Sequence, residues 1–133
     1  MKQVVIRQVK SMSMSCDPVG NVLLAKFSAV DAKDICVIIP ASIVFWLLQH
    51  IPVNQNPRLP MPPQGPGIHP DEWHDPELAR AMSVNCQTFP DALRMTFETE
   101  MRPFITVLLN LSNVELLRQY LAAYSKDLMN LDA

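Results

Sequence analysis

The stretch MSVNCQTFPDALRMTFETEMRPFITVLLNLS, residues 82–112, decides the fold. Apolar and polar residues alternate over 82–87 and again over 93–98, which is the period of a half-buried β-strand. Pro90-Asp91 lies between the two runs and is a turn signal. The continuous apolar run 104–109 then predicts a third, more central strand. Residues 82–109 are therefore expected to form three consecutive strands.

A helix is predicted directly after these strands. Ser112 is placed to act as its N-cap, and Glu115 follows at the spacing of a capping box. Apolar residues then recur at helical spacing as far as about Met129. The whole segment is therefore expected to be a β-β-β-α unit.

The same unit occurs earlier in the chain. When residues 12–51 are compared with the residues 70 positions later, 11 of 40 are identical without a gap, whereas unrelated sequences of ordinary composition would share about two or three. The identities are Met12, Ser13, Cys16, Leu23, Phe27, Ile35, Val37, Ser42, Val44, Leu47 and Gln49. The first unit is therefore predicted to contain strands near 3–14, 21–29 and 34–39. Its helix is expected to be capped by Ser42 and ended by Pro52.

These patterns predict an α+β fold made of two β-β-β-α units related by a pseudo-two-fold axis. We expect one domain over residues 1–133, with units at 1–51 and 79–133 and a proline-rich linker at 52–78. Short connections favour antiparallel neighbours. A mostly antiparallel six-stranded sheet with two helices on one face is preferred, and two facing sheets remain open.

Composition restricts the possible partners. The net charge of the 133 residues is −2, and no block is basic enough to neutralise many phosphates, so nucleic-acid binding is not expected. Three widely spaced cysteines do not form a disulfide framework, and they fit a reducing cytoplasm. We also expect Cys16 and Cys86 to serve packing rather than nucleophilic catalysis.

The apolar run 35–51 approaches the length of a membrane span. Its counterpart in the second unit carries Glu115 and Arg118 where the first carries Phe45 and Leu48. Because a duplicated element should not span lipid in only one copy, a strand followed by a helix is predicted. Phe45 and Leu48 are then expected on the outward face of the first helix. They would be covered either by linker residues or by a second subunit packed about a two-fold axis.

The linker is too rich in proline to form a helix or a central strand. It could be a passive tether, a docked arm anchored by its apolar residues, or a P-x-x-P ligand. One group of residues has metal-ligand chemistry: His69, Asp71, Glu72, His74 and Asp75. Because its spacing fixes no geometry, a solvated acidic turn before a helical start at 76–78 is preferred, and no metal or cofactor is expected.

No catalytic or phosphate-binding motif is found, and no catalytic or cofactor-binding residue is assigned. The leading prediction is a non-enzymatic interaction or regulatory protein that acts as a cytoplasmic homodimer. The candidate interface residues are Phe45, Leu48, Leu59, Met61 and Trp73. One alternative is a small-ligand-binding domain or minor enzyme, with a site between the units closed by the linker around His69, Trp73 and His74. The other is a structural component of a larger assembly.

Overall fold

The computed structural model describes residues 4–51, 67–73, 78–100 and 104–129, and contains six strands and three helices in these ranges. The strands are β1 (Val4–Asp17), β2 (Val22–Ala29), β3 (Ile35–Pro40), β4 (Ala79–Phe89), β5 (Ala92–Thr99) and β6 (Phe104–Asn110). The helices are α1 (Ala41–His50), α2 (Pro70–Trp73) and α3 (Leu111–Ser125). The predicted α+β class and the mostly antiparallel six-stranded sheet are confirmed.

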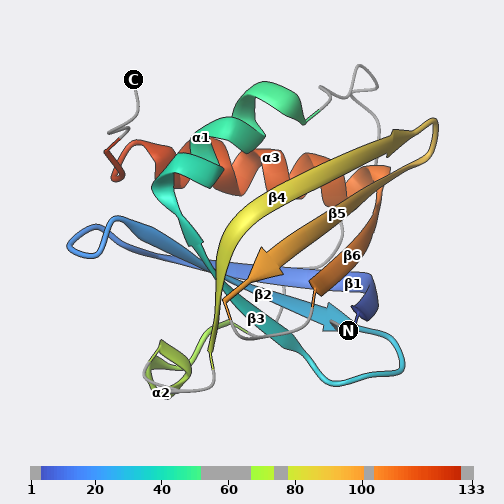
Figure 1. Ribbon diagram of the computed structural model, residues 1–133, viewed down its shortest axis with the longest axis horizontal. Helices are drawn as coiled ribbons and strands as arrows, with labels where there is room; N and C mark the ends of the chain where they lie inside the picture. The colour runs from blue at the N-terminus through green and yellow to red at the C-terminus, as the bar shows by residue number, and fades with distance from the viewer. Residues whose placement is uncertain (1–3, 52–66, 74–77, 101–103, 130–133) are drawn as a thin grey trace.

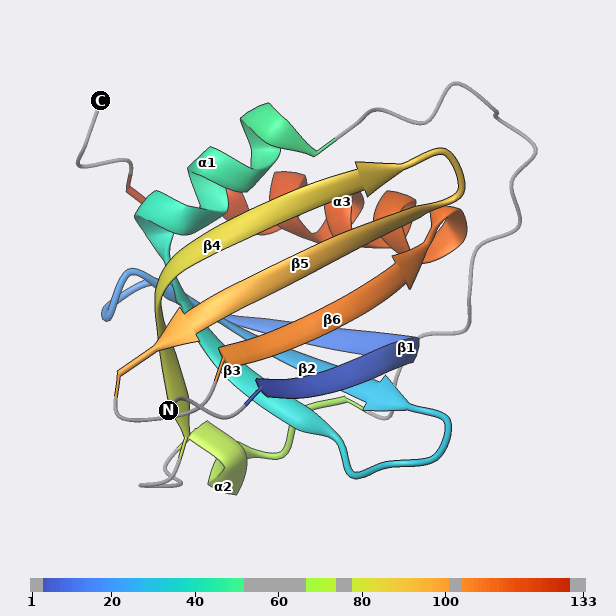
Figure 2. The ribbon, with the colours of Figure 1, turned by 45° about the vertical axis from the view of Figure 1, so that its right-hand side comes forward.

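The six strands close into a barrel in chain order. Pairs within each half are antiparallel, but β3 pairs with β4 and β1 with β6 in parallel. These two parallel pairs join the halves and close the sheet (Figure 2). The sequence analysis preferred one sheet but did not anticipate that this sheet closes on itself.

Two long strands, β1 and β4, make the closure possible because each serves two neighbours. Residues 4–8 of β1 pair with β6, and the part from Val9 onward pairs with β2. Residues 79–80 of β4 pair with β3, and the part from Ala81 onward pairs with β5. The register of each antiparallel ladder shifts at this junction, with one extra residue in β1 and in β4. Such bulges bend a strand and increase its twist, as a barrel corner requires.

The pairing patterns of the two halves match, with one correction to the sequence comparison. Leu23 pairs with Ile39 in the first half, and Leu93 pairs with Leu109 in the second, so both partners lie 70 positions later, as in the sequence comparison. However, the bulges begin at Val9 and Ala81, which are 72 positions apart. Aligning Met12–Cys16 with Met82–Cys86 was therefore wrong by two residues. The two-fold relation itself stays a prediction.

α1 and α3 pack against each other over one side of the barrel (Figure 1). The core combines inward residues of all six strands with one side of both helices. Val44 and Val114 are both buried in it, as are Leu47 and Leu117. No helix in the described part of the chain is long and apolar enough to cross a bilayer.

The helix ends differ from the sequence predictions. α3 is capped by Asn110, whose side chain accepts a hydrogen bond from the Asn113 amide at 2.8 Å, and not by Ser112. α1 begins after Pro40 with no side-chain cap, so Ser42 is not an N-cap either. Asn110 can cap as well as serine, and α3 begins directly after β6, two residues earlier than a cap at Ser112 would allow. α3 also ends at Ser125 rather than near Met129.

Asn21 ties three parts of the fold together. It adopts a left-handed conformation with φ of 56° at the end of the β1–β2 turn. Its side-chain amide donates to the Met129 carbonyl at 3.0 Å and accepts from the Met129 amide at 2.7 Å. Its carbonyl accepts from the Ala41 amide at the start of α1. The hairpin is therefore bonded to the start of one helix and to the chain beyond the other.

Two substitutions separate the roles of Asn21. Asn21→Gly keeps the left-handed backbone and removes two hydrogen bonds, so we expect a loss of about 1–2 kcal/mol in the free energy of unfolding. Asn21→Ala should cost about 1 kcal/mol more, because alanine also disfavours the left-handed region. Urea denaturation monitored by circular dichroism measures both. Equal losses for the two variants would contradict a conformational role.

Candidate interaction surface

The outer side of α1 carries exposed and half-buried apolar side chains. Trp46 is 37% exposed, whereas Phe45 and Leu48 are half-buried and pack against the core. We call these three residues the α1 patch. The side chains of Phe45 and Leu48 therefore lie at the border between the buried and the exposed sides of α1 and do not face fully outward. Trp46, which the sequence analysis did not single out, is the most exposed of the three.

Trp46 is held in place by the next turn of the helix. Its ring stacks on that of His50 with centroids 3.9 Å apart and planes 12° apart. His50 Nδ1 lies 2.7 Å from the Trp46 carbonyl oxygen and donates to it, since a carbonyl can only accept. A tryptophan ordered in this way loses less conformational freedom on binding a partner than a free one would.

The positions of α3 that match Phe45 and Leu48 carry charges instead, whereas the position that matches Trp46 is a buried leucine. Arg118 and Glu115 form an ion pair in which Nε donates to Oε2 at 3.1 Å. The hydrogen bond from Arg118 lowers the pKa of Glu115. Both side chains are partly exposed. The contrast that the sequence comparison drew between the two helices is therefore present in the structure.

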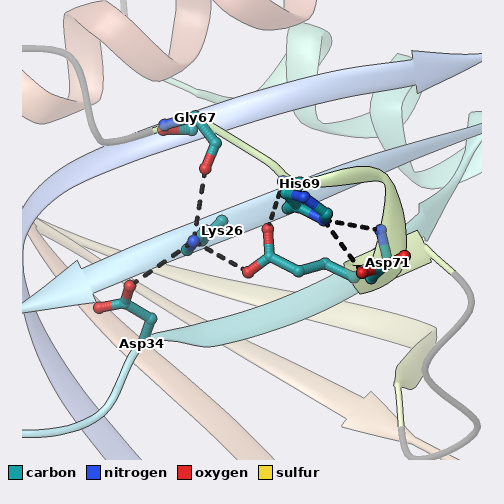
Figure 3. A network of polar contacts seen from close by, with 7 residues as sticks. Lys26, Asp34, Gly67, His69 and Asp71 are labelled. Carbon is teal, nitrogen blue, oxygen red and sulfur yellow. Dashed lines mark hydrogen bonds and ion pairs between the residues drawn. The ribbon is translucent and has the colours of Figure 1, made fainter.

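The described end of the linker is docked on the outer side of the first half of the barrel. The Gly67 amide donates to Ser13 Oγ of β1 at 3.1 Å, and Lys26 Nζ of β2 donates to the Gly67 carbonyl at 3.3 Å. Lys26 Nζ also lies 2.9 Å from Glu72 Oε1 and 3.8 Å from Asp34 Oδ2 (Figure 3). Lys26 thus joins a strand, a loop and the segment 67–73.

The Lys26–Glu72 contact changes the pKa of both groups. The hydrogen bond from Lys26 lowers the pKa of the Glu72 carboxyl, and the bond to Glu72 raises the pKa of Lys26. The Lys26 side chain is only 13% exposed, so solvent screens this pair less than an open surface pair. The contact should therefore help to hold segment 67–73 while both groups are charged.

The residues with metal-ligand chemistry are engaged with one another and with the backbone. Glu72 Oε2 accepts from the His69 amide at 2.7 Å, and His69 Nδ1 lies 3.2 Å from the Asp71 amide and 3.4 Å from Asp71 Oδ2. Within the described ranges, no group of three or more histidine, cysteine or acidic residues could hold a metal ion. His74 and Asp75 lie outside these ranges.

Other linker predictions fall partly outside the described residues. Leu59 and Met61 lie there, as do residues 76 and 77 of the expected helical start. The short helix that is described, α2, begins earlier, at Pro70, a position where proline is favoured. Trp73 ends α2 and is half-buried. A shallow hollow beside α2 lies over the first half of the barrel and is lined by Lys26, Gly67, Ile68, His69, Pro70 and Glu72.

Cys16 and Cys86 are half-buried and pack against the core. Burial raises the pKa of Cys86 to about 11. Burial is also the main cause that raises the pKa of Cys16, with Asp127 and Asp17 adding to it. Both thiols are therefore protonated near neutral pH, which is a poor state for a nucleophile.

Comparison with known proteins adds nothing to this geometry: no family model, curated protein or solved structure shows significant similarity to the chain.

Sequence reasoning missed the Lys26–Glu72 bridge and the role of Trp46. The first joins residues 46 positions apart, and no local pattern signals such a pair. The second could have been found, because Trp46 precedes His50 by one helical turn and the two rings can stack at that spacing.

Acidification tests the docking of segment 67–73. Because the folded pKa of Glu72 is lowered, its contribution is present above the ordinary value of 4.5 and is lost as pH falls through the folded pKa. In a Trp46→Phe background, Trp73 is the sole tryptophan. We expect its fluorescence emission to shift towards that of exposed tryptophan below pH 4.5.

Two further variants control this titration. Glu72→Gln should show the shifted emission already at neutral pH, whereas Asp71→Asn, which alters a carboxylate with a 91% exposed side chain, should titrate like its parent. An unchanged emission in Glu72→Gln would show that the bridge does not hold Trp73.

Proposed function

We propose that the protein is a non-enzymatic protein-interaction or regulatory protein that acts as a homodimer in the cytoplasm. The observation that carries this proposal is the α1 patch, where Phe45, Trp46 and Leu48 stand on a helix whose counterpart carries an ion pair. The half-buried free cysteines support a reducing compartment.

Physical chemistry favours a protein partner for the α1 patch. Large apolar side chains left in water forgo about 1.5–3 kcal/mol each relative to full burial. Tryptophan is among the residues that contribute most to protein interfaces. α1 contains no acidic residue, lysine or arginine, so a second α1 could approach it without charge repulsion. A two-fold interface would bury the same residues on both copies.

Sedimentation velocity over a range of concentrations tests the homodimer. We expect the native protein to dimerise and Trp46→Glu to weaken the dimer by at least about tenfold in dissociation constant, because a charge would be buried at the contact. Val19→Glu places the same charge on a residue that is 98% exposed in the β1–β2 turn, and it should sediment like the native protein. A native protein that stays monomeric at every concentration would exclude the homodimer.

A further inference from the structure

One long strand edge of the barrel has no described partner. β4 pairs with β3 only at Ala79 and Arg80, and from Ala81 to Phe89 it pairs with β5 on one side alone. Within the described ranges, no strand or backbone hydrogen bond occupies its other side. Unpaired strand edges are sites where another chain can add a strand.

The matching edge of β1 is closed by side chains of α3. Asn113 Nδ2 donates to the Val9 carbonyl at 3.3 Å, and the Tyr124 hydroxyl donates to the Met14 carbonyl at 3.0 Å. α1 cannot do the same for β4. At the offset of 70, Ile43 stands where α3 has Asn113, and α1 ends at His50, one helical turn before the position that matches Tyr124.

The open backbone groups of β4 can be assigned from its pairing. Phe89 and Ala92 flank the two-residue turn, where the closing residues form a hydrogen-bonded pair. Hydrogen-bonded pairs then recur at every second residue. Val84, Cys86 and Thr88 therefore direct their amides and carbonyls away from β5. The edge of β1 supports this assignment. Its Met14 carbonyl points away from β2 and accepts the hydrogen bond from Tyr124, and Met14 is equivalent to Cys86 at the offset of 72 set by the bulges.

Beyond its bulge, the described edge of β4 lacks the charged residues and prolines that commonly protect an edge strand. Residues 81–89 read AMSVNCQTF and contain no charge and no proline. Met82 is 60% exposed and Phe89 is 42% exposed. Natural edge strands are commonly blunted by lysine, proline or a covering segment. Because no described segment covers this edge, we expect another strand to occupy it.

We propose that β4 pairs antiparallel with β4 of a second copy, with Cys86 opposite Cys86 of that copy at the two-fold axis. This register uses all three open residues, because Val84 then lies opposite the second copy's residue 88. The proposal rests on the homodimer proposed above and adds its architecture: two barrels joined edge to edge.

A second copy suits this edge for three reasons. The segment is uncharged, so two copies approach without repulsion, and its open residues are symmetric about Cys86. In addition, α1 contacts β4 and lies beside it in both ribbon views (Figures 1 and 2). A copy that pairs with β4 would therefore bring its own α1 close to the α1 patch.

A proline substitution tests the edge directly. Thr88→Pro removes an amide hydrogen that points away from β5, so the β4–β5 ladder should survive while one cross-copy bond and its symmetry mate are lost. We expect the dimer dissociation constant to rise at least about tenfold in sedimentation velocity. Thr88→Val keeps the amide and should behave like the native protein. Circular dichroism and thermal unfolding verify the fold of each variant.

A charge pair tests the register without altering the backbone. In the proposed dimer, residue 85 of one copy lies opposite residue 87 of the other, and both side chains are exposed in the monomer. The double variant Asn85→Glu with Gln87→Glu places like charges opposite each other and should dissociate. Asn85→Lys with Gln87→Glu places opposite charges there and should dimerise at least about tenfold more tightly than the first double variant at low salt.

The outcomes separate this proposal from the α1 patch. A dimer that is weakened by Trp46→Glu but unchanged by Thr88→Pro and by both charge pairs overturns the β4 pairing and leaves the homodimer standing. A dimer weakened by Thr88→Pro and by the like-charge pair, but not by Trp46→Glu, supports the β4 pairing and excludes the α1 patch as part of the dimer interface. A native protein that is only monomeric overturns both.

Discussion

The rest of the structure depends on one constraint: β1 and β4 must each pair with two different neighbouring strands along their length. Each strand pairs with a neighbour in the other half at its start and with its own hairpin partner afterwards, and each contains a bulge at the junction. Because a bent strand changes neighbours, it leaves one edge without a strand beyond the bend. Closing the barrel and exposing two edges are therefore consequences of the same backbone feature.

The two halves treat those edges differently, and the length of the helices explains why. α3 has 15 residues, and its polar side chains reach two carbonyls of β1. α1 has 10 residues, is apolar where α3 is charged, and offers β4 no equivalent donor in the described structure. With a similar pairing pattern, one half has its edge bonded by its own helix, and the other has no such bonds among the described residues. The asymmetry arises in side chains and helix length rather than in the sheet.

The sequence predicted the strands and the two long helices because hydrophobic periodicity is a local signal, although both predicted N-caps were wrong. It failed where the cause was distant. Six strands and two long helices follow from periods that can be counted. The parallel pairs that close the barrel involve residues about 40 to 100 positions apart and have no signature in the sequence. The two-residue error in aligning β1 with β4 has a clear origin: a slip of two preserves which side chains face inward, whereas a slip of one reverses it. The Lys26–Glu72 bridge was missed because nothing local marks a lysine that binds a distant loop.

The side of the barrel formed by α1 and β4 exposes two kinds of group that a partner could bury or bond: apolar side chains and backbone amides and carbonyls. The apolar side chains of α1 gain by leaving water, and the open amides and carbonyls of β4 gain by finding directed partners. A small apolar ligand would cover only the side chains of α1, and water can bond only the backbone groups of β4. An extended protein strand with a helix beside it would do both, because its backbone bonds to the edge while its side chains cover the helix. Such a strand and helix are present together in the chain itself, so a second copy of the chain could supply both.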